Sequence, residues 1–319
     1  MSDPVRVRAT WARSLLGVLL LVLVAVAGTA LVLTLDHAPT EEGRPELTAQ
    51  EHALLVPRLA DMDEGIDRLV EQGAQLAQAG RDVLTRAGDL DPDGVDAAIL
   101  VGSQASAAID GQREDLVARR AGLMAGIDAS RIRMSDRTRI GAIDRAVIGA
   151  TRLPEAWASV VAAAIGPRDL VRSIQAHDAR VADATAAARA DDLPGALAAL
   201  QDAQRRLVAA RAVRATADEA GADVTTLDDL LSRLDAYDAA LTRLYTLLRA
   251  SDGAVTEEVR EAYEDVGAAQ GSLPLDQDAL TTIVADLGGR TITAALVDIE
   301  AQRALLADAV AARPVTDGR

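Results

Sequence analysis

The chain contains neither cysteine nor phenylalanine, and its aromatic residues are limited to two tryptophans and three tyrosines. Without cysteine there are no disulfides, thiol nucleophiles, iron–sulfur clusters or thiolate zinc sites. Half of the residues are still hydrophobic, so the apolar mass is alanine, leucine, valine and isoleucine. Alanine and leucine are among the strongest helix formers. The composition therefore predicts an all-α protein whose helices approach one another closely.

Lysine and asparagine are also absent, and every one of the 33 basic residues is arginine. Without lysine there is no P-loop lysine, no protein-kinase lysine and no Schiff base. The H-E-x-x-H and G-x-S-x-G motifs are missing as well. The missing residue types indicate a GC-rich coding sequence, so we expect a bacterial source. We expect no catalytic activity. These exclusions leave one alternative open, which is catalysis by a pair of acidic side chains.

Charge is distributed unevenly along the chain, whose net charge is −16. Residues 1–13 carry three arginines against one aspartate, and residues 14–35 carry no charge, which leaves −18 for the remainder. A domain this acidic repels phosphate backbones. We therefore expect no nucleic-acid partner.

The uncharged stretch, residues 14–35, has the length of a membrane span. A helix over these residues would be about 33 Å long, against about 30 Å for a hydrocarbon core. Arginines precede it and acids follow it, so the positive-inside rule places residues 1–13 in the cytoplasm and the body outside the cell membrane. The alternative is a signal peptide cleaved near Ala27 or Ala30, which gives a secreted protein. Both interpretations make the body extracytoplasmic.

The rest of the chain shows helical periodicity and no sustained alternation, so we expect about nine to ten helices and no sheet. Helices over 47–87 and 93–127 should form an antiparallel hairpin. Pro154 should open a short helix that ends at Pro167, and Gly288-Gly289 should break the chain. The expected organisation is a cytoplasmic tail (1–13), a transmembrane signal anchor (14–35), a juxtamembrane linker (36–46), a helical hairpin with an Arg-rich helix (47–152), a helical bundle (153–312) and a disordered tail (313–319).

One helix carries a heptad pattern. Extra apolar residues at Leu231, Tyr245 and Leu247 widen the stripe beyond a two-stranded seam, which favours a bundle-core helix over a dimeric coiled coil. The residues three and four apart are Leu227, Leu230, Leu234, Tyr237, Leu241, Leu244 and Leu248.

An acidic turn resembles the start of a calcium-binding loop. Carboxylates alternate up to Gly94, as they do in the first six positions of such a loop, but the twelfth position is Leu100 instead of glutamate. The alternative is a helix-hairpin turn in which an aspartate caps the second helix. Calcium is the one cofactor that this pattern suggests. Its candidate ligands are Asp89, Asp91, Asp93 and Asp96.

An arginine cluster follows, and it suggests a site for an anionic ligand or partner in an otherwise acidic body. The alternative is that these arginines pair with acidic faces of the same fold. The candidates are Arg131, Arg133, Arg137 and Arg139. His177 lies on an apolar helical face without a second histidine at ligand spacing, so we interpret it as a hydrogen-bonded boundary residue.

These features predict a membrane-anchored, extracytoplasmic interaction or scaffolding protein of a bacterial cell envelope, without catalysis. Its partners would be the lipid bilayer through residues 14–35, and a protein partner or a second copy through helix faces. We expect the heptad helix and the Arg-rich segment to supply the faces that bind this partner. The alternative is an extracytoplasmic sensor or ligand-binding helical bundle that works with a membrane partner.

Overall fold

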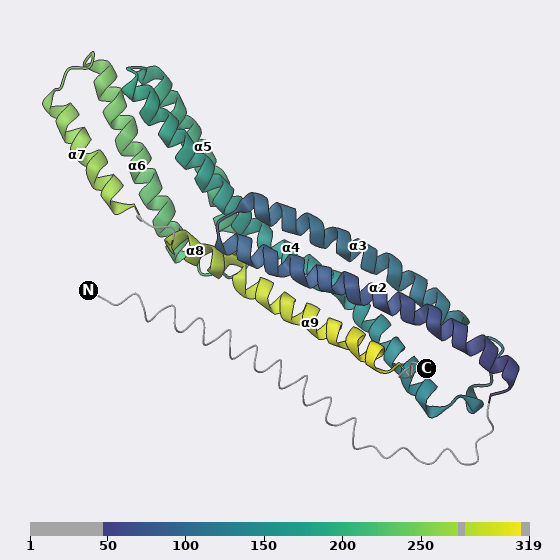
Figure 1. Ribbon diagram of the computed structural model, residues 1–319. Helices are drawn as coiled ribbons and strands as arrows, with labels where there is room; N and C mark the ends of the chain where they lie inside the picture. The colour runs from purple at the N-terminus through teal and green to yellow at the C-terminus, as the bar shows by residue number, and fades with distance from the viewer. Residues whose placement is uncertain (1–46, 274–277, 314–319) are drawn as a thin grey trace. The chain divides into compact units, whose positions relative to one another are not determined.

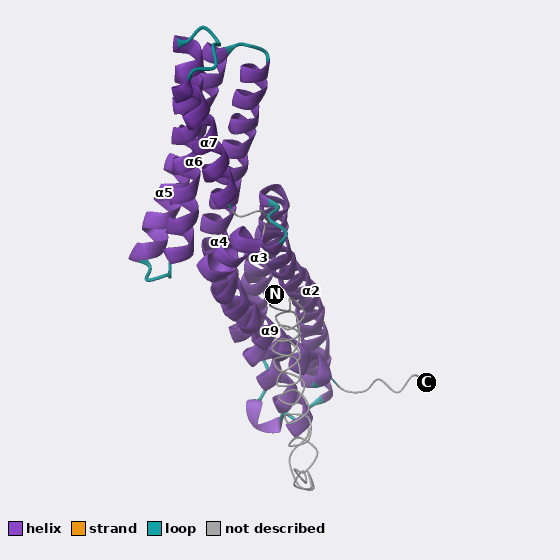
Figure 2. Cartoon of the chain, turned by 90° about the vertical axis from the view of Figure 1, so that its left-hand side faces the viewer, coloured by secondary structure: helices purple, strands orange, loops and turns teal. Residues whose placement is uncertain are grey.

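The computed structural model describes residues 47–273 and 278–313, and these residues form helices without any strand (Figures 1 and 2). The predicted all-α class is confirmed. The expected anchor, residues 14–35, lies outside the described residues. The elements are α2 (Ala49–Gly88), α3 (Pro92–Gly122), the 3-10 turn η1 (Ala129–Arg131), α4 (Met134–Arg189), α5 (Leu193–Glu219), α6 (Thr225–Ala250), α7 (Glu257–Ser272), α8 (Asp278–Val284), the π turn η2 (Ala285–Gly289) and α9 (Arg290–Ala311).

The hairpin of α2 and α3 agrees with the sequence, but the predicted number of helices is wrong because α4 does not break. It runs for 56 residues through both Pro154 and Pro167. A proline inside a helix removes one hydrogen bond and costs about 3 kcal/mol, so other contacts must hold α4 together. The boundary expected between residues 152 and 153 therefore falls inside a continuous helix.

The predicted break at Gly288-Gly289 is also wrong. A π turn there joins α8 to α9 without interrupting the helical path. Gly288 lies so close to α4 that a Cβ atom on it would be 2.5 Å from the carbonyl oxygen of Ala163. Because Pro167 has no amide hydrogen, that same oxygen lacks its usual donor four residues on. The π turn therefore packs where the helical hydrogen bonding of α4 is incomplete.

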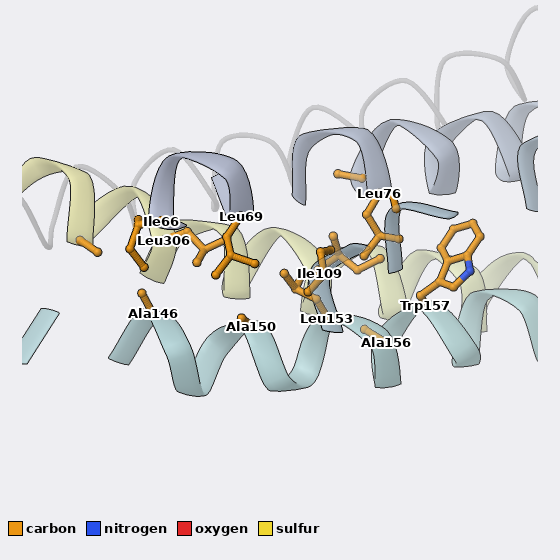
Figure 3. Close-up of a cluster of buried hydrophobic side chains, with 14 of the residues drawn as sticks. Ile66, Leu69, Leu76, Ile109, Ala146, Ala150, Leu153, Ala156, Trp157 and Leu306 are labelled. Atoms are coloured by element: carbon orange, nitrogen blue, oxygen red, sulfur yellow. The ribbon is translucent and has the colours of Figure 1, made fainter. Parts of the chain in front are cut away.

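The first helix group consists of α2, α3, the N-terminal half of α4, and α9, which pack side by side (Figure 1). Its core joins Ile66 of α2, Ile109 of α3, Leu153 of α4 and Leu306 of α9 (Figure 3). Small residues allow this close approach. A Cβ atom on Gly102 would lie 2.1 Å from the ring of Trp157, so only glycine fits there. Burial of such side chains supplies most of the stability of the group.

The second helix group consists of the C-terminal half of α4 with α5, α6 and α7 (Figure 2). It has two apolar layers. One contains Leu170, Leu207, Leu227 and Leu234, and the other contains Val181, Leu200, Leu241, Tyr245 and Val259. Five of the seven heptad side chains of α6 are therefore buried in their own fold, as the core-helix interpretation expects, and Tyr237 and Leu248 are half-buried. This burial leaves little of the heptad face free to contact a partner.

The turn between α2 and α3 packs against the middle of α4, where the two helix groups meet. Leu90 of the turn forms a small apolar cluster with Val171 and Val284. The Gln175 side chain donates a hydrogen bond to the carbonyl oxygen of Leu90 at 3.0 Å. Polar and apolar contacts thus hold this turn on α4 at the level where α8 also packs.

Candidate functional site

The acidic turn at residues 89–96 is occupied by contacts within the fold. Asp91 caps α3 by accepting a hydrogen bond from the backbone of Gly94 at 2.9 Å. Asp96 accepts hydrogen bonds from Arg172 at 2.8 Å and Arg168 at 2.7 Å. The hydrogen bond from Arg172, with help from Arg168, lowers the pKa of Asp96 despite its partial burial. Across the described residues, no three acidic or histidine side chains gather in a way that could hold a metal ion.

A second turn in the chain uses the same capping geometry without any calcium-loop spacing. Asp192 caps α5 by accepting from the backbone of Gly195 at 2.9 Å, as Asp91 does from Gly94. In both turns the residue just before the capping aspartate has positive φ, 56° for Leu90 and 64° for Asp191. Helix capping therefore accounts for the aspartate and the glycine in both turns. The remaining predicted ligands are exposed Asp89 and Asp93, and Asp93 accepts from Arg172 at 3.0 Å.

Three of the four predicted arginines serve the fold. Arg131 lies 3.6 Å from Glu51 and 3.4 Å from Asp128. Arg139 forms an ion pair with Asp63 of α2. Arg137 donates to the carbonyl oxygens of Ala129, Ser130 and Ile132 at 2.9, 3.1 and 3.1 Å. Arg133 is exposed at the start of α4. This arrangement supports the alternative interpretation, in which the arginines stabilise their own fold.

An uncharged face of α3 remains exposed. Residues 97–109 carry no charge, although the body is strongly acidic. Leu100 is 60% exposed and Val101 is 53% exposed. The exposed residues of this face, which we call the α3 stripe, are Ala97, Leu100, Val101, Gln104, Ala107, Ala108 and Gly111. Their spacing of three and four residues places them on one side of the helix.

A groove of about 1130 Å³ lies along α4 and α5 and is bordered by η2 and the start of α9. Most of its lining is apolar, including Ala162, Ile165, Val213 and Leu287. Its charged residues are Asp169, Arg172, Arg205 and Arg206. With a single acid in its lining, the groove offers no carboxylate pair for acid–base catalysis. It is instead suited to binding an apolar ligand that also carries negative charge.

A buried ion pair lies between the two apolar layers of the second helix group. His177 of α4 is 1% exposed and Asp238 of α6 is 0% exposed. The His177 Nε2 atom lies 3.1 Å from Asp238 Oδ1, and its Nδ1 atom lies 2.9 Å from Asp178 Oδ1. Burial by itself would lower the pKa of His177, but the two carboxylates outweigh it and raise the pKa to about 9. The histidine is therefore fully buried, unlike the boundary residue we expected.

Sequence reasoning missed Asp238, although a signal for it was present. This residue follows Leu234 by four positions and precedes Leu241 by three, so it stands on the apolar face of the heptad helix. An acid on such a face must have a partner in the core. A histidine on the apolar face of another helix was the natural candidate.

Among the described residues, one helical stretch, Asp278–Ala311, is long and apolar enough to cross a membrane by length and composition. This stretch comprises α8, η2 and α9. Ile292, Ile299 and Leu306 of α9 are buried in the first helix group. Packing in that core accounts for these three residues, whereas Val297 of α9 is exposed.

No protein-family model, no curated protein and no solved structure matches the chain. Two features stand out because the fold does not use them, namely the α3 stripe and the groove along α4 and α5. Both are candidate binding surfaces.

Proposed function

We propose that the protein is a membrane-anchored, extracytoplasmic helical interaction module of a bacterial cell envelope that acts without catalysis and pairs with a second copy through α3. The observation that carries this proposal is the uncharged, exposed α3 stripe on a body of strong negative charge. Apolar surface that stays exposed on an otherwise charged protein is typical of interaction sites.

The α3 stripe is complementary to itself in the antiparallel direction. If two copies cross at Gln104, Leu100 lies opposite Ala108, and Val101 lies opposite Ala107. Each large side chain then meets a small one, as in close helix packing. The two Gln104 side chains meet at the twofold axis, where each amide can donate to the other. No charge becomes buried at the centre of the pair, and the surface is the same on both copies, as a twofold interface requires.

Anchoring would favour this pairing. The uncharged residues 14–35 and the basic residues before them support an anchor with the body outside the membrane. Two anchored bodies share one surface, which raises their effective concentration and offsets the repulsion between two acidic bodies.

Single-cysteine variants of the full chain test the pairing, because the natural chain has no cysteine. In native membranes, Gln104→Cys should form a disulfide-linked dimer under mild oxidation. Leu100→Cys alone should not, because the two copies of residue 100 would be about 12 Å apart along the axis. Leu100→Cys expressed together with Ala108→Cys should restore the crosslink.

Ala198→Cys, at an exposed position on α5, is the matched control and should stay monomeric. The self-pairing proposal fails if Gln104→Cys gives no more dimer than Ala198→Cys. A strong dimer from Leu100→Cys alone would instead show parallel pairing and would contradict the proposed crossing.

The second proposed function is ligand binding by the extracytoplasmic helices, with a membrane partner to receive the signal. The groove along α4 and α5 favours it, because its mostly apolar lining with a few charged groups is typical of small-molecule sites. A ligand-induced rise in the unfolding temperature of the full chain would support this function.

A further inference from the structure

The two ends of the groove differ in chemistry. A short turn joins α4 to α5, so the two helices run antiparallel. They are close at Gly166 and Val213, where a Cβ atom on the glycine would lie 3.7 Å from Val213 Cγ1. Seven residues further along α4 is Ser173, and seven residues back along α5 is Arg206. These two residues therefore lie at the same level, about 10 Å along the helix axes from the contact between Gly166 and Val213.

Positive charge collects at that distant end. Arg172, Arg205 and Arg206 line it, with Asp169 between them and the apolar end. Arg172 is already paired with Asp93 and Asp96, so Arg205 and Arg206 carry the charge that a ligand would meet. Arg205 is paired with Asp202 at the surface, and such exposed pairs are weak enough to exchange for a ligand. Arg206 is exposed and forms no ion pair with any described residue. On a body of net charge −18, this arginine end is complementary to an anion.

The other end is apolar. Ala162, Ile165, Val213 and Ala217 line it, and Leu287 of η2 borders it. From the level of Ser173 to Ser159 the groove follows α4 for about 21 Å. One acyl chain needs about 15 Å, since two chains fill a hydrocarbon core of about 30 Å.

We infer that the groove binds a single-chain anionic amphiphile, with a carboxylate or phosphate head at Arg205 and Arg206 and its acyl chain directed toward Leu287. Arginine binds either head group through paired hydrogen bonds. An acidic helix of a partner protein is the alternative occupant, and the photocrosslinking experiment below distinguishes it from an amphiphile. The inference rests on the second proposed function, ligand binding, and is independent of pairing through α3.

Photolabelling of the full chain in nanodiscs of zwitterionic lipid tests the inference. The probes share a diazirine-bearing acyl chain and differ in the head, which is a carboxylate, a lysophosphate or an uncharged alcohol. Mass spectrometry of the labelled peptides should place both acidic probes in residues 159–176 and 205–220. The ratio of the two acidic probes identifies the preferred head group.

Arg206→Glu should reduce labelling by the acidic probes about tenfold, because a charged hydrogen bond becomes a repulsion. Arg152→Glu makes the same change of charge at an exposed site outside the groove and should leave labelling unchanged. Equal labelling of the groove by the alcohol probe would overturn the anionic class while leaving ligand binding intact. Absence of label from the groove with every probe would overturn the ligand-binding function as well.

A photocrosslinking amino acid at Ala212, in the groove, tests the natural occupant in cells. An adduct with the mass of a lipid that Arg206→Glu reduces would support the inference. An adduct with the mass of a protein would overturn it in favour of a partner helix.

Discussion

The contacts of His177 identify its protonation state. Both ring nitrogens lie within hydrogen-bond distance of carboxylate oxygens, from Asp178 and Asp238. A neutral imidazole has one donor and one acceptor, so one nitrogen would face a carboxylate without a proton. The imidazolium donates from both. The ion pair is therefore charged at neutral pH, in the middle of an apolar core.

This ion pair predicts that stability falls as the pH rises. The pKa of His177 is about 9 in the fold against an ordinary value of 6.5. The stabilisation is complete below pH 6.5, declines above it, and is lost once the pH passes about 9. A shift of this size corresponds to about 3 kcal/mol. Urea unfolding of the full chain in mild detergent, followed by circular dichroism, should show this decline between pH 6.5 and 9.5.

The control for this prediction is the double variant His177→Leu and Asp238→Leu, which replaces the pair by apolar side chains. Its stability should be nearly independent of pH over the same window. An equal decline in the double variant would assign the pH dependence to other groups. Asp238→Asn alone should be strongly destabilising, because it removes the buried charged partner of His177 and leaves only the exposed Asp178.

At this scale the sequence predicts more than we first inferred from it. The positions of His177 and Asp238 on apolar helix faces indicate two buried polar groups. Their pairing was beyond prediction, because 61 residues separate them and only the packing of α4 against α6 brings them together. The helix cap at Asp91 could be predicted, because Asp91 and Gly94 are close in sequence and the contact between them is local.

At the scale of elements, α4 shows why proline is an uncertain sign of a helix end. The helix α2, which begins and ends within two residues of the expected range, has its start set by a local signal. Thr48 and Glu51 form a capping box at the start of α2. Pro154 and Pro167 are local signals too, yet α4 continues through both. Tertiary contacts from α9 and η2 outweigh the local cost, and these contacts come from more than a hundred residues away in the sequence.

Because η2 packs closely on α4, alanine substitutions at its two neighbouring glycines should have different effects on stability. Gly288→Ala should destabilise the protein by about 1–3 kcal/mol, because its Cβ atom would lie 2.5 Å from a backbone oxygen of α4 that cannot move aside. Gly289→Ala should be close to neutral, since its nearest neighbour is Ala285 Cβ at 3.8 Å. Thermal unfolding of both variants measures the difference. Equal effects would mean that the close packing of η2 on α4 does not limit stability.

At the scale of the whole described region, composition was sufficient to predict an all-α fold with close helix packing. Small residues achieve this packing, such as Ala146 and Ala150 in the core (Figure 3). Gly102 against Trp157 is a further example. The sequence predicted two parts that divide between residues 152 and 153, but which helices belong to each group was not predictable. It depends on α9 returning to pack beside α2 and α4, which periodicity along the chain does not encode. The groove was missed for the same reason, because its walls come from separate helices.

The two helix groups have separate apolar cores, which are connected through α4, through the helical run of α8, η2 and α9, and through the small cluster at Leu90. A change in one core should therefore affect the other less than its own group. Leu200→Ala removes a side chain that is 1% exposed in the second group and should cost about 2–5 kcal/mol. Hydrogen exchange of the full chain should then rise in α5, α6 and α7, while amides of α2, α3 and α9 keep their protection.

Leu69→Ala is the reciprocal variant, since Leu69 is 0% exposed in the first group. It should raise exchange in α2, α3 and α9 and leave α6 and α7 protected. In α4 the two variants should act on opposite halves, because each half belongs to a different core. If both variants raise exchange equally in both groups, α4 and the turn at Leu90 couple the cores into one cooperative unit. That result would also imply that a ligand in the groove, which lies along α4, is sensed by both groups at once.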